Sequence, residues 1–258
     1  QLTVAGERAE PIRIMPLGDS LTEGGDPTKP TTSPQSYRGY LYTMLRDAGY
    51  DVDFVGSHQT PAIAGEDPDN EGHGGFTIGP DESVLCSGCP AANLSAHVDA
   101  WIAKAKPDVI VLMAGVNDLF PIDVPTNGAI RPVRPEDAPA KLAALVAQVS
   151  AAAPRTEILV ASYPPLPMFQ APGTSGFSLL RAINEAARTA GERGGRLHYV
   201  PLAEELSLAW TPGDSIADGL HPSPGGADKV AAVIRAAYAN YPSPQLSALV
   251  AQLDAEGR

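Results

Sequence analysis

The chain has 258 residues, of which 43% are hydrophobic and 19% are charged, and its formal net charge is −12. This length fits one large domain or two small ones, and an α/β domain of this size buries about three-quarters of its unfolded surface. The acidic excess argues against nucleic acid or an anionic membrane as the main partner, because phosphate groups attract a basic face. The longest strongly apolar run, Val109–Ala114, is far shorter than the ~20 residues that cross a bilayer. We therefore expect a soluble globular protein that acts on something neutral.

Hydrophobic periodicity predicts alternating strands and helices along the chain. Apolar runs predict strands at residues 12–17, 52–55, 108–114, 158–162 and 197–200. Amphipathic stretches predict helices at residues 37–48, 94–105, 135–152, 178–193 and 227–240, and residues 56–80 are expected to form a long loop. Strands separated by helices pair in parallel through right-handed crossovers, with helices on both faces. The pattern therefore predicts an α/β fold around a five-stranded parallel sheet, without an internal repeat or a dividing linker.

A serine follows the first predicted strand, at the sheet edge where ligands of such folds bind. Ser20 stands in the sequence G-D-S-L-T-E-G, between small neighbours that leave room for a substrate. A serine at a strand-to-helix turn can present its hydroxyl above the sheet edge. The alternative is that Ser20 only caps a helix, which serine does well.

His221 is the best candidate for the base that a serine nucleophile needs. It stands in D-G-L-H-P, just after the last predicted strand and before the last predicted helix. Asp218, three residues upstream, can reach the far ring nitrogen, fix the tautomer and stabilise the imidazolium. The alternative is an uncoupled loop aspartate and a solvent-exposed histidine. The other histidines lie in the long loop or are expected to be structural: His58, His73, His97 and His198.

Acyl transfer also needs hydrogen-bond donors for an oxyanion. Asn117 follows the third predicted strand, Gly75 offers an unobstructed backbone N–H in the sequence G-H-G-G-F, and the Ser20 N–H is a third candidate. Each such donor stabilises the transition state by about 3–4 kcal/mol in comparable sites. Taken singly, Asn117 could instead cap a helix and Gly75 could simply allow a tight turn.

The two cysteines, Cys86 and Cys89, stand in a C-S-G-C run within a stretch rich in glycine, proline and serine. This context is unlike that of a thioredoxin-type pair, which opens a helix after a strand. We expect a local disulfide in an exported protein, with a pair of reduced, buried thiols as the alternative. The chain begins with Gln1, and its first ten residues lack the apolar stretch of a signal peptide. We expect a secreted protein whose leader is not part of this chain.

Four ordered blocks of this sequence resemble those of the SGNH (GDSL) hydrolase superfamily: Gly18-Asp19-Ser20-Leu21, the loop glycine Gly75, Gly115-Val116-Asn117-Asp118 and Asp218-Gly219-Leu220-His221. The resemblance covers nearly the whole chain, from residue 12 to about residue 241, and implies a flavodoxin-like three-layer α/β/α sandwich. It implies that Ser20 is the nucleophile, that His221 and Asp218 form the base pair, and that the Ser20 N–H, Gly75 and Asn117 form the oxyanion hole. No cofactor or metal is implied. We expect one domain over residues 1–258, with a C-terminal tail at 242–258.

A narrower resemblance links the chain to family 3 carbohydrate esterases, which include acetylxylan esterases. It rests on the strings I-M-P-L-G-D-S, S-Y-R-G-Y-L-Y, V-D-F-V-G-S and D-P-D-N-E-G-H-G-G-F-T-I, which span residues 14–78. The chain departs from that family in proline-rich segments near residues 27–34, 122–135 and 170–176, in the C-S-G-C run and in its tail. The acidic loop at residues 66–71 lacks the spacing and the turn glycine of an EF-hand, so we expect a solvated loop there without calcium.

These observations predict a monomeric serine esterase that removes small acyl groups, above all acetyl, from the hydroxyls of a polysaccharide such as xylan. The expected partner is a small acyl ester or an acetylated polysaccharide, and neither nucleic acid nor a membrane span is expected. A lipolytic esterase, a phospholipase or an acyltransferase with the same site is the first alternative. A non-catalytic carbohydrate-binding protein is the second.

Overall fold

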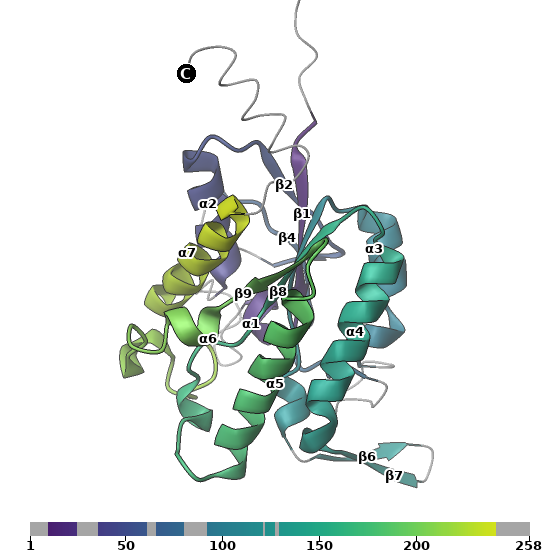
Figure 1. Ribbon diagram of the computed structural model, residues 1–258, viewed down its shortest axis with the longest axis vertical. Coiled ribbons are helices and arrows are strands. Elements are labelled where there is room, and N and C mark those ends of the chain that lie inside the picture. Colours follow the sequence, from purple (N-terminus) through teal and green to yellow (C-terminus); the bar gives the residue numbers. More distant parts are fainter. Residues whose placement is uncertain are drawn as a thin grey trace, which may run out of the picture.

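A computed structural model gives the protein's fold and describes residues 10–24, 36–60, 66–79, 92–120, 122–126 and 129–240, with 122–126 and 129–133 described as backbone. A central sheet lies between two layers of helices (Figure 1). Helices α2 (Tyr37–Asp47) and α7 (Pro224–Asn240) pack together on one face. Helices α3 (Val98–Ala105), α4 (Ala138–Ala152) and α5 (Ser175–Gly191) cover the other face. The predicted three-layer α/β/α architecture is confirmed.

The main sheet is parallel except at one edge, and its strand order is β3-β4-β1-β5-β8-β9, with β2 also paired to β1. Its strands are β1 (Ile12–Gly18), β2 (Val52–Phe54), β3 (His58–Gln59), β4 (Asp69–Gly72), β5 (Val109–Met113), β8 (Glu157–Ala161) and β9 (Leu197–Val200). The residues of β1, β5 and β8 are almost all buried, as expected for strands that are covered on both faces.

The five predicted strands are present as β1, β2, β5, β8 and β9, but the prediction of a five-stranded sheet is wrong, because this sheet has seven strands. Strands β3 and β4 lie inside the segment that was expected to be a loop, residues 56–80. Strand β4 has the sequence D-N-E-G, which shows no apolar alternation, and its polar side chains are nevertheless largely buried. The proline-rich segment near residues 122–135 contains the hairpin β6 (Ile122–Thr126) and β7 (Ala129–Val133).

The predicted helices are present with shifted ends. Helix α5 begins three residues early, where the Thr174 hydroxyl accepts a hydrogen bond from the Phe177 N–H and caps it. The helix predicted at 94–105 is divided at His97 into the 3₁₀ turn η1 (Leu94–Ala96) and α3. None of the helices in the described part of the chain is long and apolar enough to cross a membrane.

Gly18 aligns the ends of three neighbouring strands. It pairs in register with Gly72 of β4 on one side and with Met113 of β5 on the other. A Cβ atom on Gly18 would lie 2.1 Å from the Met113 carbonyl oxygen, and one on Gly72 would lie 2.2 Å from the Glu23 nitrogen. Only glycine lets the backbones approach each other this closely at these two positions. The segments that follow these three strands therefore leave the sheet side by side.

We predict that Gly18→Ala destabilises the fold by roughly 3 kcal/mol, the upper end of the usual overpacking penalty, because the backbone carbonyl of Met113 cannot give way. Urea unfolding followed by circular dichroism measures the change. Gly213→Ala is the matched control, since its added Cβ would meet only the Thr211 hydroxyl at 3.8 Å. Equal stability of the two variants would contradict this account of the sheet.

Candidate active site

Ser20 lies at the turn from β1 into the short helix α1 (Ser20–Glu23), where its side chain remains partly exposed. Asp19 is the N-cap residue, and its carboxylate accepts a hydrogen bond from the Leu21 N–H at 3.0 Å. The first N–H groups of a helix have no partner within the helix. The Ser20 hydroxyl and N–H are therefore both presented at the carboxyl edge of the sheet.

His221 and Asp218 complete a chain of hydrogen bonds to Ser20. The His221 Nε2 lies 2.9 Å from the Ser20 Oγ, and the His221 Nδ1 lies 2.6 Å from the Asp218 Oδ2. Burial raises the pKa of the Asp218 carboxyl, but hydrogen bonds from the His221 ring and from the N–H groups of Leu220 and His221 outweigh it, so the pKa lies below its ordinary value. An ionised carboxylate only accepts hydrogen bonds, so Nδ1 carries the proton and Nε2 faces the serine hydroxyl as an acceptor.

The sequence predicts that His221 directly follows the last strand. This prediction is wrong, because other elements separate the strand from the turn that carries His221. Helix α6 (Leu202–Glu205) and the 3₁₀ turn η5 (Pro212–Asp214) lie between β9 and this turn. The Ile216 N–H donates to the His221 carbonyl at 2.9 Å, and the Met168 N–H donates to the Gly219 carbonyl at 2.9 Å. The loop after β8 thus supports the histidine turn from the side.

Asn117 and the Gly74–Gly75 turn lie at the same edge. Asn117 is buried in the 3₁₀ turn η2 (Val116–Leu119) after β5, and its amide donates to the Phe76 carbonyl at 2.8 Å. This bond uses one of the two amide hydrogens and leaves the other for a ligand. Gly75 has a φ of +78°, which favours glycine. A Cβ on Gly74 would lie 3.7 Å from the Ser20 Cβ, so this turn lies beside the serine.

Tyr163 is a buried residue that the sequence motifs do not include. Its hydroxyl donates to the Asp19 Oδ2 at 2.5 Å and accepts from the Val116 N–H at 2.9 Å. Burial raises the pKa of Asp19, and burial together with the Asp19 charge raises that of Tyr163 well above its ordinary value, so the phenol keeps its proton. One hydroxyl therefore links the turn that carries Ser20 to the turn that carries Asn117. Its position just after β8 is the only sequence signal that could have indicated it.

The histidines of the predicted loop and the second predicted helix lie in an aromatic stack. The His73 ring stacks on Trp101 with centroids 4.1 Å apart and an interplanar angle of 9°. His58 lies 4.2 Å from His73, and His97 lies 5.2 Å from Trp101. The His73 Nε2 also lies 2.6 Å from the Glu71 Oε1. This stack supports the loop that leads into the Gly74–Gly75 turn.

Carboxylates of the acidic loop make local hydrogen bonds. Asp67 accepts from the N–H groups of Phe54 at 2.9 Å and Asp69 at 3.1 Å. Glu71 accepts from the N–H and the hydroxyl of Ser57 at 2.8 and 2.6 Å. These carboxylates therefore stabilise the irregular backbone around β4.

One further histidine of the sequence analysis lies away from this edge. His198 belongs to β9, and its Nε2 lies 2.6 Å from the Glu157 Oε2 of the neighbouring strand. Cys86 and Cys89, for which we expected a disulfide, lie outside the described residues.

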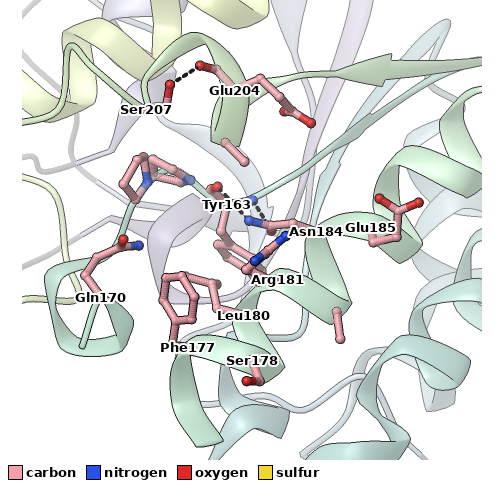
Figure 2. A pocket seen from close by; sticks show the side chains of 14 residues that line it. Tyr163, Gln170, Phe177, Ser178, Leu180, Arg181, Asn184, Glu185, Glu204 and Ser207 are labelled. Carbon is pink, nitrogen blue, oxygen red and sulfur yellow. Dashed lines mark hydrogen bonds between the residues drawn. The ribbon is translucent and has the colours of Figure 1, made fainter. Parts of the chain in front are cut away.

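A pocket of about 860 Å³ is lined by Tyr163, by the loop that follows it and by one side of α5 (Figure 2). Asn184 of α5 also lines this pocket. Its side-chain oxygen accepts the Tyr163 N–H at 2.8 Å, and its side-chain NH2 group donates to the Tyr163 carbonyl at 3.2 Å. Neither Ser20 nor His221 lines this pocket. The hydrogen-bonded chain at the sheet edge, and not this pocket, is therefore the candidate active site.

We predict that Tyr163→Phe lowers the free energy of unfolding by roughly 2–3 kcal/mol at neutral pH, because Asp19 loses a donor and the Val116 N–H loses an acceptor. Loss of the donor raises the pKa of Asp19 in the folded variant further. Because the folded variant then binds its proton more tightly than the unfolded chain does, the variant loses folding stability as the pH rises through that pKa. The deficit should be smallest below about pH 4, where the carboxyl is protonated in both states. Urea unfolding across this pH range tests it. Tyr199→Phe, which removes a partly buried hydroxyl that bonds Glu204 and does not contact Asp19 or Val116, is the control.

Comparison with known proteins shows which family this chain is similar to. The model of the GDSL-like Lipase/Acylhydrolase family matches residues 17–229. The solved structure of a Clostridium thermocellum family 3 carbohydrate esterase matches with a TM-score of 0.67 and 28% identity, over 93% of this chain and 99% of that chain. A family 3 carbohydrate esterase from Talaromyces cellulolyticus has the same fold, with a TM-score of 0.63 and 21% identity over 93% of this chain and 99% of that chain.

A curated relative agrees with this assignment. The multidomain esterase of Ruminococcus flavefaciens is 31% identical over 122 residues, which are 42% of this chain. The match spans only 14% of that protein's length. Because the family model covers most of the sequence, the chain belongs to the GDSL-like lipase/acylhydrolase family and is a carboxylic ester hydrolase.

Proposed function

We propose that this enzyme removes acetyl groups from the sugar hydroxyls of a polysaccharide such as xylan, through an acyl-enzyme on Ser20. The observation that carries the proposal is the chain Asp218–His221–Ser20, with contacts of 2.6 and 2.9 Å at an edge that also holds Asn117. A serine, a correctly oriented imidazole and a carboxylate in this order are the parts that acyl transfer needs.

In the acylation step, the Ser20 Oγ attacks the ester carbonyl while the His221 Nε2 takes its proton. Asp218 holds the proton on Nδ1 and stabilises the imidazolium that forms. The oxyanion accepts hydrogen bonds from the Ser20 N–H, the Gly75 N–H and the second amide hydrogen of Asn117. His221 then protonates the departing sugar oxygen, and the alcohol leaves with the acetyl group still bound to Ser20.

In the deacylation step, His221 accepts a proton from a water molecule, which attacks the acetyl carbonyl. The same donors stabilise the second oxyanion. The Ser20 oxygen regains its proton from His221 as acetate leaves, and no cofactor takes part in any of these steps.

The substrate class rests on similarity to proteins that carry the name of carbohydrate esterase. The 28% identity to the Clostridium thermocellum protein extends over 93% of the chain. A polysaccharide cannot enter a cell intact, so export of this enzyme is part of the proposal. We also propose that the enzyme acts as a monomer. A longer acyl group is the second candidate, favoured by Met168, whose exposed side chain lies on the loop that supports Gly219.

Replacing the nucleophile tests the reaction and the substrate together. Ser20→Ala should reduce acetate release from acetylated xylan by at least about 10³-fold, because no other hydroxyl can form the acyl-enzyme. Ser207→Ala, which removes an exposed hydroxyl whose one hydrogen bond within the described part of the chain is to the Glu204 carbonyl, is the control and should retain activity. If the wild type releases no acetate, a series of simple esters from acetate to long acyl chains decides whether the acyl group was misassigned.

The pH profile tests the roles of His221 and Asp218. We expect kcat/KM to fall as the pH is lowered from about 8 to 5, because a protonated imidazole cannot accept the serine proton. Asp218 is not the source of this fall, since its lowered pKa keeps it ionised throughout this range. Asp218→Asn should lower kcat by about 10²–10⁴-fold by favouring the wrong tautomer.

Asp228→Asn, an exposed substitution on α7, is the matched control for this profile and should behave as the wild type. A wild-type rate that stays flat between about pH 5 and 8 would remove His221 from the role of base.

A further inference from the structure

We infer that Glu23 is a positioning residue that fixes the Gly74–Gly75 turn, so that the Gly75 N–H is aimed at the oxyanion. This inference rests on the proposed function, because it assigns a purpose to an oxyanion donor. Glu23 touches neither Ser20 nor His221 in any hydrogen bond of the described residues. Its role is to orient a donor that does touch the reacting group.

The carboxylate of Glu23 accepts the Gly74 N–H at 2.6 Å. A backbone N–H bound to a carboxylate forms a charge-assisted bond, about twice as strong as one between neutral groups. The bond fixes the peptide plane that precedes Gly74. The next peptide unit along the chain carries the Gly75 N–H, so only the φ and ψ angles of Gly74 separate the anchor from the proposed donor.

The anchor belongs to the same short helix as Ser20. Helix α1 begins with Ser20 and ends with Glu23, whose N–H donates to the Asp19 carbonyl at 2.9 Å. The buried guanidinium of Arg38 donates to the carbonyls of Thr22 and Glu23, each at 2.8 Å. The four-residue helix α1 therefore fixes how far the Glu23 carboxylate, and with it the Gly74–Gly75 turn, lies from Ser20.

Steric contact shows how closely the three groups approach. A Cβ on Gly74 would lie 2.6 Å from the Glu23 Oε2 and 3.7 Å from the Ser20 Cβ. Gly74 thus lies between the carboxylate and the serine side chain. Two consecutive glycines have the largest conformational freedom that a chain offers. The turn has one backbone hydrogen bond of its own, from the Phe76 N–H to the His73 carbonyl at 3.2 Å, and the Glu23 carboxylate supplies a second, shorter restraint at Gly74.

Loss of the anchor should act on the transition state more than on substrate binding. An oxyanion donor is effective only about 2.7–3.1 Å from the oxygen, and complete removal of one costs about 10²–10³-fold in kcat. A donor that still exists but is no longer held in place should cost less, about 10–100-fold. Because the oxyanion forms only in the transition state, kcat should fall while KM changes little.

The test compares Glu23→Gln, Glu23→Asp and Glu23→Ala with the wild type on p-nitrophenyl acetate. The glutamine carbonyl can still accept the Gly74 N–H, so Glu23→Gln should recover most of kcat. Aspartate keeps the charge but is one methylene too short, so Glu23→Asp should lose kcat about as Glu23→Ala does. Glu192→Ala, which removes an exposed carboxylate paired with Arg188, is the control for loss of a surface charge and should match the wild type.

Two outcomes would overturn the inference: an unchanged kcat in both Glu23→Asp and Glu23→Ala, or a loss in Glu23→Gln as large as that in Glu23→Ala. Hydrogen exchange of the Gly74 amide supplies a readout that needs no activity. Exchange should accelerate in Glu23→Ala and Glu23→Asp but not in Glu23→Gln, and equal protection in all variants would also overturn the inference. Failure of the proposed function is recognised separately, by a wild type that hydrolyses no acetyl ester.

Discussion

The close approach of three strand ends at Gly18 is the constraint on which the rest of the site depends. A single glycine pairs with β4 on one side and β5 on the other, and a methyl group there would lie 2.1 Å from a carbonyl oxygen. This register brings the segments after β1, β4 and β5 together at one edge. Ser20, the Gly74–Gly75 turn and Asn117 are neighbours because the sheet is tight there.

Such tight packing creates an electrostatic problem, which buried hydrogen bonds resolve. Asp19 is fully buried beside the serine, and an unpaired carboxylate would be costly in this environment. The hydroxyl of Tyr163 and the N–H of Leu21 satisfy it, and the hydroxyl of Tyr163 also binds the turn that carries Asn117. Further hydrogen bonds hold the helix that begins at Ser20: the buried Arg38 donates to the carbonyls of Thr22 and Glu23, and the Glu23 carboxylate accepts the Gly74 N–H. Buried polar groups thus hold the turn that carries Ser20, which is partly exposed, and the turn that carries Asn117.

The sequence predicts this architecture where its signals are local. Apolar runs identify the five strands with buried side chains, and short motifs after strand ends identify Ser20, Asn117 and His221. Strand β4 was missed because its buried side chains are polar and bind the surrounding backbone, so hydrophobicity carries no trace of it. Tyr163 was missed for a different reason, since its partner lies 144 positions away and only the folded chain shows the contact. The assignment of catalytic roles to the site remains a prediction, as does the disulfide of the C-S-G-C run.

The order in which this site is assembled follows from its position in the chain. Ser20 and His221 are separated by 201 residues, so the serine leaves the ribosome long before the histidine is synthesised. At about 5–20 residues per second, the delay is roughly 10–40 s. During that time the hydroxyl lacks the base that we propose for it and is an ordinary, unreactive alcohol. In the proposed mechanism, a chain that ends before His221 therefore cannot hydrolyse an ester, and activity begins only after folding brings Ser20 and His221 together.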